Sequence, residues 1–138
     1  MTIGREIPLA LDVGTRTIGI AVAEQGIVLP VCVLARQSVS KDAARVVALC
    51  RARSVTVVVV GMPFELDGSE SRSARLARQV GDAVASAGFP VAYQDERYTT
   101  VEAIERLGAA AVYRERRKAA VDQVAACVIL EEWLKGRG

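Results

Sequence analysis

Histidine is absent from the 138 residues of this chain. Imidazole is the commonest general base near neutral pH and the commonest metal ligand, so its absence excludes histidine-based acid–base catalysis and histidine-ligated metal sites. Any reaction must therefore depend on carboxylates, hydroxyls, thiols, lysine or a hard metal ion.

Aromatic residues and cysteines are also scarce. Aromatics make up 4% of the sequence, so few rings are available for single-stranded bases to stack on. The three cysteines, Cys32, Cys50 and Cys127, are far apart and lack the spacing of zinc ligands. Their odd number argues against an oxidising compartment. We expect Cys50 and Cys127, which lie in apolar helical patterns, to be buried as small hydrophobic residues.

No apolar stretch is long enough to cross a membrane, because Asp12, Glu24 and Arg36 interrupt the first third of the chain. No charged segment precedes an apolar one as in a signal peptide, so we expect a soluble, cytoplasmic protein. The net charge of +2 gives no overall basic field. Two local basic clusters, at 71–78 and 114–118, are typical of solvated surfaces, and the alternative is contact with a charged partner.

Length and composition favour a single folded domain over residues 1–138, since domains average roughly 150 residues. A chain of this size removes roughly 68–70% of its unfolded surface from water. The hydrophobic content of 51% supplies the material for such a core.

Short aliphatic runs separated by turn residues predict strands, and apolar residues at helical spacing predict helices. The predicted strands lie at 7–13, 18–23, 27–34, 55–61 and 89–94. The predicted helices lie at 41–53 after Ser40, at 72–87 ending at Gly88, from Thr99 onward with a capping box to Glu102, and at 119–135 after a basic loop or helix start at 109–118.

This order predicts an α/β fold. Three antiparallel strands come first and βαβ crossovers follow, which gives a mixed five-stranded sheet with helices on both faces. The strand order is that of the RNase H-like fold, although the order alone leaves other α/β sandwiches open.

Asp12 stands in the first predicted strand, where Leu9, Leu11 and Val13 share one face and Ala10 and Asp12 the other. A carboxylate in a central strand is costly unless it is paired or binds a metal ion. Asp12 either caps the following turn or serves a metal or phosphate site at the strand end.

Two further acidic positions follow the same logic. Asp95 and Glu96 end the last predicted strand, and one of them should point into the sheet crevice because strand side chains alternate; a salt bridge to Arg97 is the alternative for either. Asp122 shares an apolar stripe of the last helix with Ala126, Ile129 and Trp133. It either complements the helix dipole or faces a cation.

Three acids from the first strand, a later strand end and the last helix form the ligand set that a hard divalent cation prefers. Two Mg²⁺ or Mn²⁺ ions at such a site would activate a water and stabilise the leaving oxygen of a phosphodiester. This mechanism needs no histidine.

Four ordered motifs, ALDVGTRTIGIAV, VVVVGMPFELDGSESRSA, YQDERYTTVEA and AVDQVAACVILEEWL, closely resemble the YqgF/RuvX family of bacterial RNase H-fold nucleases over residues 8–134. The resemblance implies metal-dependent hydrolysis of phosphodiesters, either in maturation of the 5′ end of pre-16S rRNA or on Holliday junctions. It places the catalytic and metal-binding carboxylates at Asp12, Glu96 and Asp122, and it selects Glu96 rather than Asp95.

Basic and hydroxyl residues near these acids are candidates for contact with substrate phosphates. The alternative for each is a structural role, and the segment 108–120 is variable in the family that the chain resembles. The candidate substrate-binding residues are Arg16, Ser71, Arg72, Arg97, Arg114 and Arg117.

Two other classes of function compete with a nuclease. The DVGTRT segment resembles the phosphate turn of actin-like ATPases, but those enzymes close two such domains around ATP and 138 residues provide one. A non-catalytic nucleic-acid-binding or transcription-associated protein is the other alternative; the presence of all three acids disfavours it. A junction resolvase should be a homodimer, whereas processing of one RNA end needs only a monomer.

Overall fold

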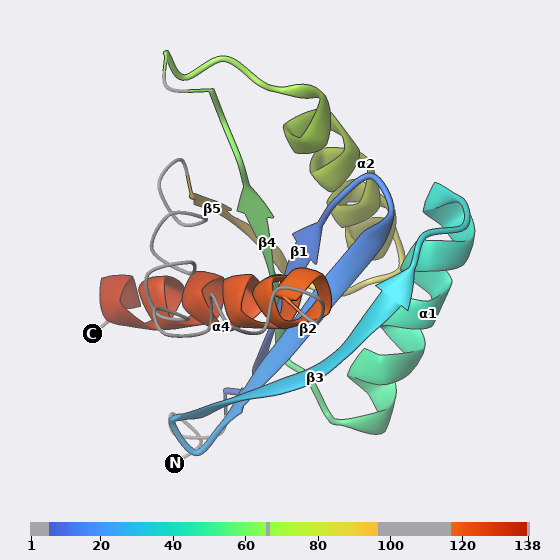
Figure 1. Ribbon diagram of the computed structural model, residues 1–138. Coiled ribbons are helices and arrows are strands. Elements are labelled where there is room, and N and C mark those ends of the chain that lie inside the picture. Colours follow the sequence, from blue (N-terminus) through green and yellow to red (C-terminus); the bar gives the residue numbers. More distant parts are fainter. Residues whose placement is uncertain (1–5, 66, 97–116, 138) are drawn as a thin grey trace.

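The computed structural model describes residues 6–65, 67–96 and 117–137, and for 117–123 it describes the backbone alone (Figure 1). The strands are β1 (Pro8–Val13), β2 (Thr17–Glu24), β3 (Ile27–Ala35), β4 (Val57–Met62) and β5 (Val91–Asp95). The helices are α1 (Val39–Ala52), α2 (Arg72–Ser86) and α4 (Arg117–Arg137). The helix predicted from Thr99 and most of the basic segment 109–118 lie outside the described residues.

The sheet has the order β3-β2-β1-β4-β5. β1 and β3 each pair antiparallel with β2, whereas β4 pairs parallel with β1 and β5. Because parallel neighbours need a crossover, α1 leads into β4 and α2 leads into β5 (Figure 1). The predicted mixed five-stranded sheet is confirmed.

The two faces of the sheet are covered by different helices (Figure 1). Leu9, Leu11 and Val13 pack in one core cluster with α1 and α2. Ala10 belongs to a second cluster under α4, which crosses the sheet over β1, β2 and β3. The alternation predicted for β1 is therefore confirmed, and α4 covers the face on which Ala10 lies.

Helix α1 begins two residues earlier than predicted. Its N-cap is Ser38 rather than Ser40, and the Ser38 hydroxyl accepts a hydrogen bond from the backbone N–H of Lys41 at 3.2 Å. Both serines can cap a helix, and Ser38 does so because its backbone is extended while Ser40 is already helical.

Helix α2 ends as predicted beside a glycine. Ala87 is its C-cap, and Gly88 adopts a φ of 104°, which a residue with a side chain rarely adopts. Cys50 is buried in α1, as expected, and Cys127 is half-buried. No helix within the described ranges is long and apolar enough to span a membrane.

Candidate active site

Asp12 lies near the end of β1 on the face covered by α4. The face follows from alternation, because Ala10, two residues earlier, packs in the cluster beneath α4. The residue is half-buried. The end of a central strand therefore presents a carboxylate at the border between the core and solvent.

Glu96 directly follows β5 and points inward. Its backbone N–H donates to the carbonyl of Met62 at 3.1 Å, which continues the pairing of β5 with β4. Glu96 is only 6% exposed, whereas Asp95 is exposed. Sequence reasoning alone left the choice between these two acids open, and the burial of Glu96 agrees with the choice that the family resemblance made.

Gly61 in β4 leaves the space that the Glu96 side chain occupies. A Cβ atom at Gly61 would lie 2.6 Å from Glu96 Oε2 and 2.5 Å from Ile129 Cδ1 of α4. Both distances are shorter than real contacts of a Cβ atom. Sequence analysis did not single out Gly61, and its signal was a glycine at the end of a run of four valines.

The carboxyl groups of Asp12 and Glu96 are near enough for the charge of one to act on the other. Burial raises the pKa of Glu96, and the nearby charges of Asp12 and Asp95 raise it further, to about 9. Two acids from the ends of separate strands thus converge in a poorly solvated place, where a bound cation would compensate their charge.

The third predicted acid, Asp122, lies within helix α4, and its side chain is outside the described portion. The rest of its stripe behaves as predicted, since Ala126, Ile129 and Trp133 are buried against the sheet. Ile129 packs beside the Gly61 position and Glu96. Among the residues with described side chains, no group of three acidic or cysteine residues could hold a metal ion.

Three candidate substrate-binding residues are described with their side chains. Arg16 is exposed in the turn between β1 and β2, at the end of the sheet where Asp12 lies. Arg72 is exposed at the start of α2. Ser71 is the N-cap of that helix, and its hydroxyl accepts from the N–H of Ala74 at 3.0 Å and donates to the carbonyl of Pro63 at 2.9 Å. The structure thus gives Ser71 a capping role, with the phosphate contact still a prediction.

The remaining candidates lie beyond this description: Arg97 and Arg114 are outside the described residues, and Arg117 is described only as the first backbone position of α4. In the basic cluster at 71–78, Arg78 is paired with Glu70 and lies over the ring of Tyr93. Part of this cluster is therefore engaged within the protein rather than open to a partner.

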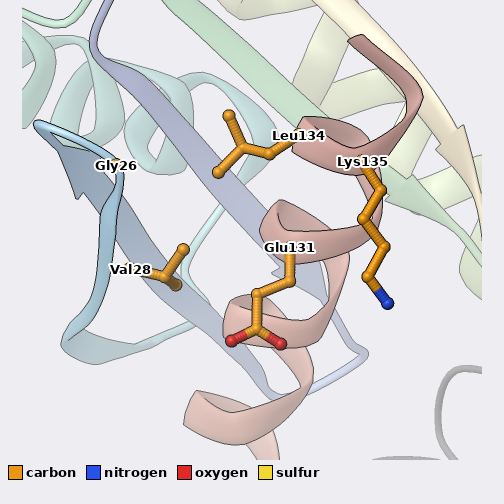
Figure 2. Close-up of a pocket in the computed structure, with 5 residues that line it drawn as sticks. All are labelled: Gly26, Val28, Glu131, Leu134 and Lys135. Atoms are coloured by element: carbon orange, nitrogen blue, oxygen red, sulfur yellow. The ribbon is translucent and has the colours of Figure 1, made fainter. Parts of the chain in front are cut away.

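An open pocket of about 540 Å³ lies at the other end of the sheet (Figure 2). Gly26 and Val28 of the β2–β3 hairpin line it opposite Glu131, Leu134 and Lys135 of α4. The hairpin adjoins the start of β1, whereas Asp12 is near its end. The pocket is therefore separate from the acidic pair.

Comparison with known proteins gives consistent matches over nearly the whole chain. The family model described as "RuvX: Holliday junction resolvase" matches residues 6–136. A protein of Myxococcus xanthus named "Putative pre-16S rRNA nuclease" is 41% identical over 133 residues, which cover 91% of this chain and 85% of that protein. A protein of the same name from Anaeromyxobacter sp. is 39% identical and covers 94% and 96% of the two chains.

Solved structures of Holliday junction resolvases share the fold. RuvC of Thermus thermophilus in complex with a junction substrate superimposes with a TM-score of 0.57 at 16% identity, covering 90% of this chain and 91% of that one. The fowlpox virus resolvase gives a TM-score of 0.60 at 10% identity, with coverage of 96% and 99%. The RNase H-like arrangement predicted from the strand order is thereby confirmed, and the chain belongs to the RuvX family.

Proposed function

We propose that this protein is a cytoplasmic, divalent-metal-dependent endonuclease that hydrolyses phosphodiesters at the 5′ end of pre-16S rRNA. The observation that carries the proposal is the convergence of Asp12 and Glu96 beneath α4 at one end of the sheet. Relatives that are 41% and 39% identical over most of the chain are named as pre-16S rRNA nucleases, which supports the choice of substrate.

The residues present fit a Mg²⁺ or Mn²⁺ ion. Both ions prefer oxygen ligands, and Asp12 and Glu96 supply carboxylates from two strands in a partly desolvated place. Asp122, on the α4 stripe that packs over this region, is the proposed third ligand. When bound, two such ions would activate a water and stabilise the leaving oxygen of an in-line displacement.

The chain's own residues would hold and orient the substrate at this end of the sheet. Gly61 leaves the space for Glu96, and Ile129 of α4 packs beside that space. Arg16, exposed in the turn after β1, would neutralise a substrate phosphate. Ser71 and Arg72 at the start of α2 are proposed to contact further phosphates along the nucleic-acid strand. Arg97, Arg114 and Arg117 complete the proposed set.

The family description favours a second substrate, a four-way DNA junction. The same carboxylates would serve either nucleic acid, because the metal-dependent step acts on the phosphodiester and not on the base. A resolvase must cut two symmetric strands and would therefore work as a twofold dimer.

One assay separates these functions. Purified protein is incubated with a pre-16S rRNA 5′ leader and, in parallel, with a four-way junction, each with Mg²⁺ or Mn²⁺. We expect wild type to cleave the RNA and Asp12→Asn to leave it intact, because the amide cannot replace the anionic ligand. Asp82→Asn is the matched control, since Asp82 is an exposed acid on α2 that accepts a hydrogen bond from Tyr93 at 2.6 Å.

Each outcome of the assay is decisive. Junction cleavage without RNA cleavage would favour the resolvase. No cleavage of either substrate by wild type would favour a non-catalytic nucleic-acid-binding protein. Equal cleavage by wild type and Asp12→Asn would contradict the mechanism, and circular dichroism of both proteins checks that the substitution does not unfold the chain.

A further inference from the structure

An ionic network with a buried centre contacts the turn that follows Asp12. Its centre is Asp42, in the first turn of α1, which is completely buried. Arg36 donates from Nε to Asp42 Oδ2 at 2.5 Å, and Arg45 donates from Nη2 to Oδ1 at 2.7 Å. The backbone N–H of Gln37 donates to the same Oδ1 at 3.0 Å. The carboxylate is thus fully engaged by two cations and one amide.

Arg36 also reaches the turn between β1 and β2. Its Nη1 donates to the carbonyl of Gly14 at 2.8 Å, and its backbone N–H donates to the carbonyl of Arg16 at 2.8 Å. The turn is closed by the N–H of Gly14, which donates to the carbonyl of Thr17 at 2.8 Å. One residue therefore fixes the turn through both its main chain and its guanidinium.

Stability alone is a weak reason for such a network. The desolvation of buried ion pairs offsets much of their attraction, and apolar replacements are often as stable. A guanidinium can also fix the relative position of two groups, because its rigid, planar donors reach a carboxylate and a carbonyl at the same time. In Arg36 these two acceptors are Asp42 and Gly14, which belong to different elements. The network thus joins the start of α1 to the end of β1.

We propose that Arg36, oriented by Asp42, is a positioning residue that holds the end of β1 and with it the carboxylate of Asp12. Only Val13 separates Asp12 from Gly14, so a shift of the Gly14 carbonyl would move the strand end that carries Asp12. This inference rests on the proposed function, in which Asp12 is a metal ligand. Groups that orient metal ligands from outside typically change affinity or activity 10–100-fold when removed.

The test compares Arg36→Met with Arg45→Met. Each variant removes one cationic partner of Asp42, but of the two arginines Arg36 is the one that bonds the turn, whereas Arg45 bonds the carbonyl of Ala35 at 2.6 Å. Four quantities are measured below the unfolding temperature of both variants: the Mn²⁺ dissociation constant by electron paramagnetic resonance, kcat, KM, and the rate of hydrogen exchange of the Gly14 amide.

We expect Arg36→Met to raise the Mn²⁺ dissociation constant about tenfold, to lower kcat more than it raises KM, and to speed exchange at Gly14. Arg45→Met should change the Mn²⁺ dissociation constant, kcat and KM by less than about twofold each. If Arg36→Met does not fold, Arg36→Lys replaces it, since lysine keeps the charge beside Asp42 but lacks the planar fork.

Two results would overturn the positioning role. In the first, the Arg36 variant binds Mn²⁺ and exchanges the Gly14 amide as wild type does. In the second, the Arg36 and Arg45 variants lose Mn²⁺ affinity and activity equally. Failure of the proposed function has a different signature. In that case wild type binds Mn²⁺ through Asp12 yet cleaves neither nucleic acid, and the affinity and exchange data still decide the role of Arg36. Absence of Mn²⁺ binding by wild type would overturn both.

Discussion

At the scale of single residues, the candidate site depends on a glycine, Gly61, whose lack of a side chain leaves room for Glu96. Gly61 has no Cβ, and the Glu96 carboxyl and the end of the Ile129 side chain occupy the space where one would be. Gly61 stands two residues after Val59, which packs beneath α4, so it faces the same helix. A buried carboxyl beside Asp12 therefore requires glycine at this position of β4.

Gly61→Ala should lower both the cleavage rate and the stability of the protein. The new methyl group would displace Glu96, so we expect cleavage to fall by about a hundredfold, as for a misplaced reacting group. Overpacking should lower the free energy of unfolding by about 1–3 kcal/mol. Cleavage rates and urea denaturation measure the two effects.

Gly81→Ala is the matched control for that substitution. A Cβ at Gly81 would lie 2.6 Å from the hydroxyl of Tyr93, a side chain that is partly exposed and can turn away. Gly81 belongs to α2 on the opposite face of the sheet, so cleavage should stay at the wild-type rate. An equal loss of activity in both variants would show that crowding of Glu96 is not the cause.

At the scale of elements, α1 is joined to the sheet by charge as well as by its apolar face. Burial alone would raise the pKa of Asp42, but hydrogen bonds from Arg36, Arg45 and Gln37 outweigh burial and hold that pKa below its ordinary value. The ionised form is therefore the one that the folded state stabilises.

This shift predicts acid sensitivity of α1 docking. Because the folded-state pKa lies below the unfolded value of about 3.9, the contribution of Asp42 is complete above about pH 4 and is lost as pH falls through the folded-state pKa. Asp42→Asn should cost roughly 3 kcal/mol at pH 7, the scale of breaking a buried ion pair. It should also flatten the dependence of stability on pH below 4. Urea denaturation between pH 2.5 and 7 measures both, and an unchanged pH profile in the variant would contradict the assignment.

At the scale of the whole molecule, the proposed site joins parts that are distant in sequence. Asp12 lies in the first strand and Glu96 directly follows the last, and α4 packs across the sheet. An ion that binds carboxylates from separate elements binds the folded state and not the unfolded chain. Metal binding and global folding should therefore be coupled.

Mn²⁺ at 100 times its dissociation constant should raise the free energy of unfolding of wild type by about 2.7 kcal/mol. Trp133, the single tryptophan, lies in α4, is buried against the sheet and reports unfolding by fluorescence. Asp12→Asn should show little of this gain, and buffer without divalent metal ions, containing a chelator, gives the baseline. Equal stabilisation of both proteins would mean that the ion binds elsewhere.

Local patterns in the sequence were enough to predict the described strands and helices, the mixed sheet and the positions of the acidic residues. Alternation along residues 8–13 assigned Asp12 to the face of Ala10, and helical spacing placed Ala126, Ile129 and Trp133 on a buried stripe; both follow from local periodicity. Periodicity is carried by neighbouring residues, so it can be read without knowing the fold.

Which side chains come into contact depends on how the elements pack in three dimensions. The inward turn of Glu96 rather than Asp95 depends on space at Gly61. The Ser71 hydroxyl donates to the carbonyl of Pro63, and the link from Asp42 through Arg36 to Gly14 joins α1 to the β1–β2 turn. These contacts connect residues that lie 6 to 35 positions apart along the chain, and their partners are set by the crossing of elements in space. Patterns among neighbouring residues do not predict how distant elements cross. The contacts from Asp42 through Arg36 to Gly14 could therefore be found in the structure but not in the sequence.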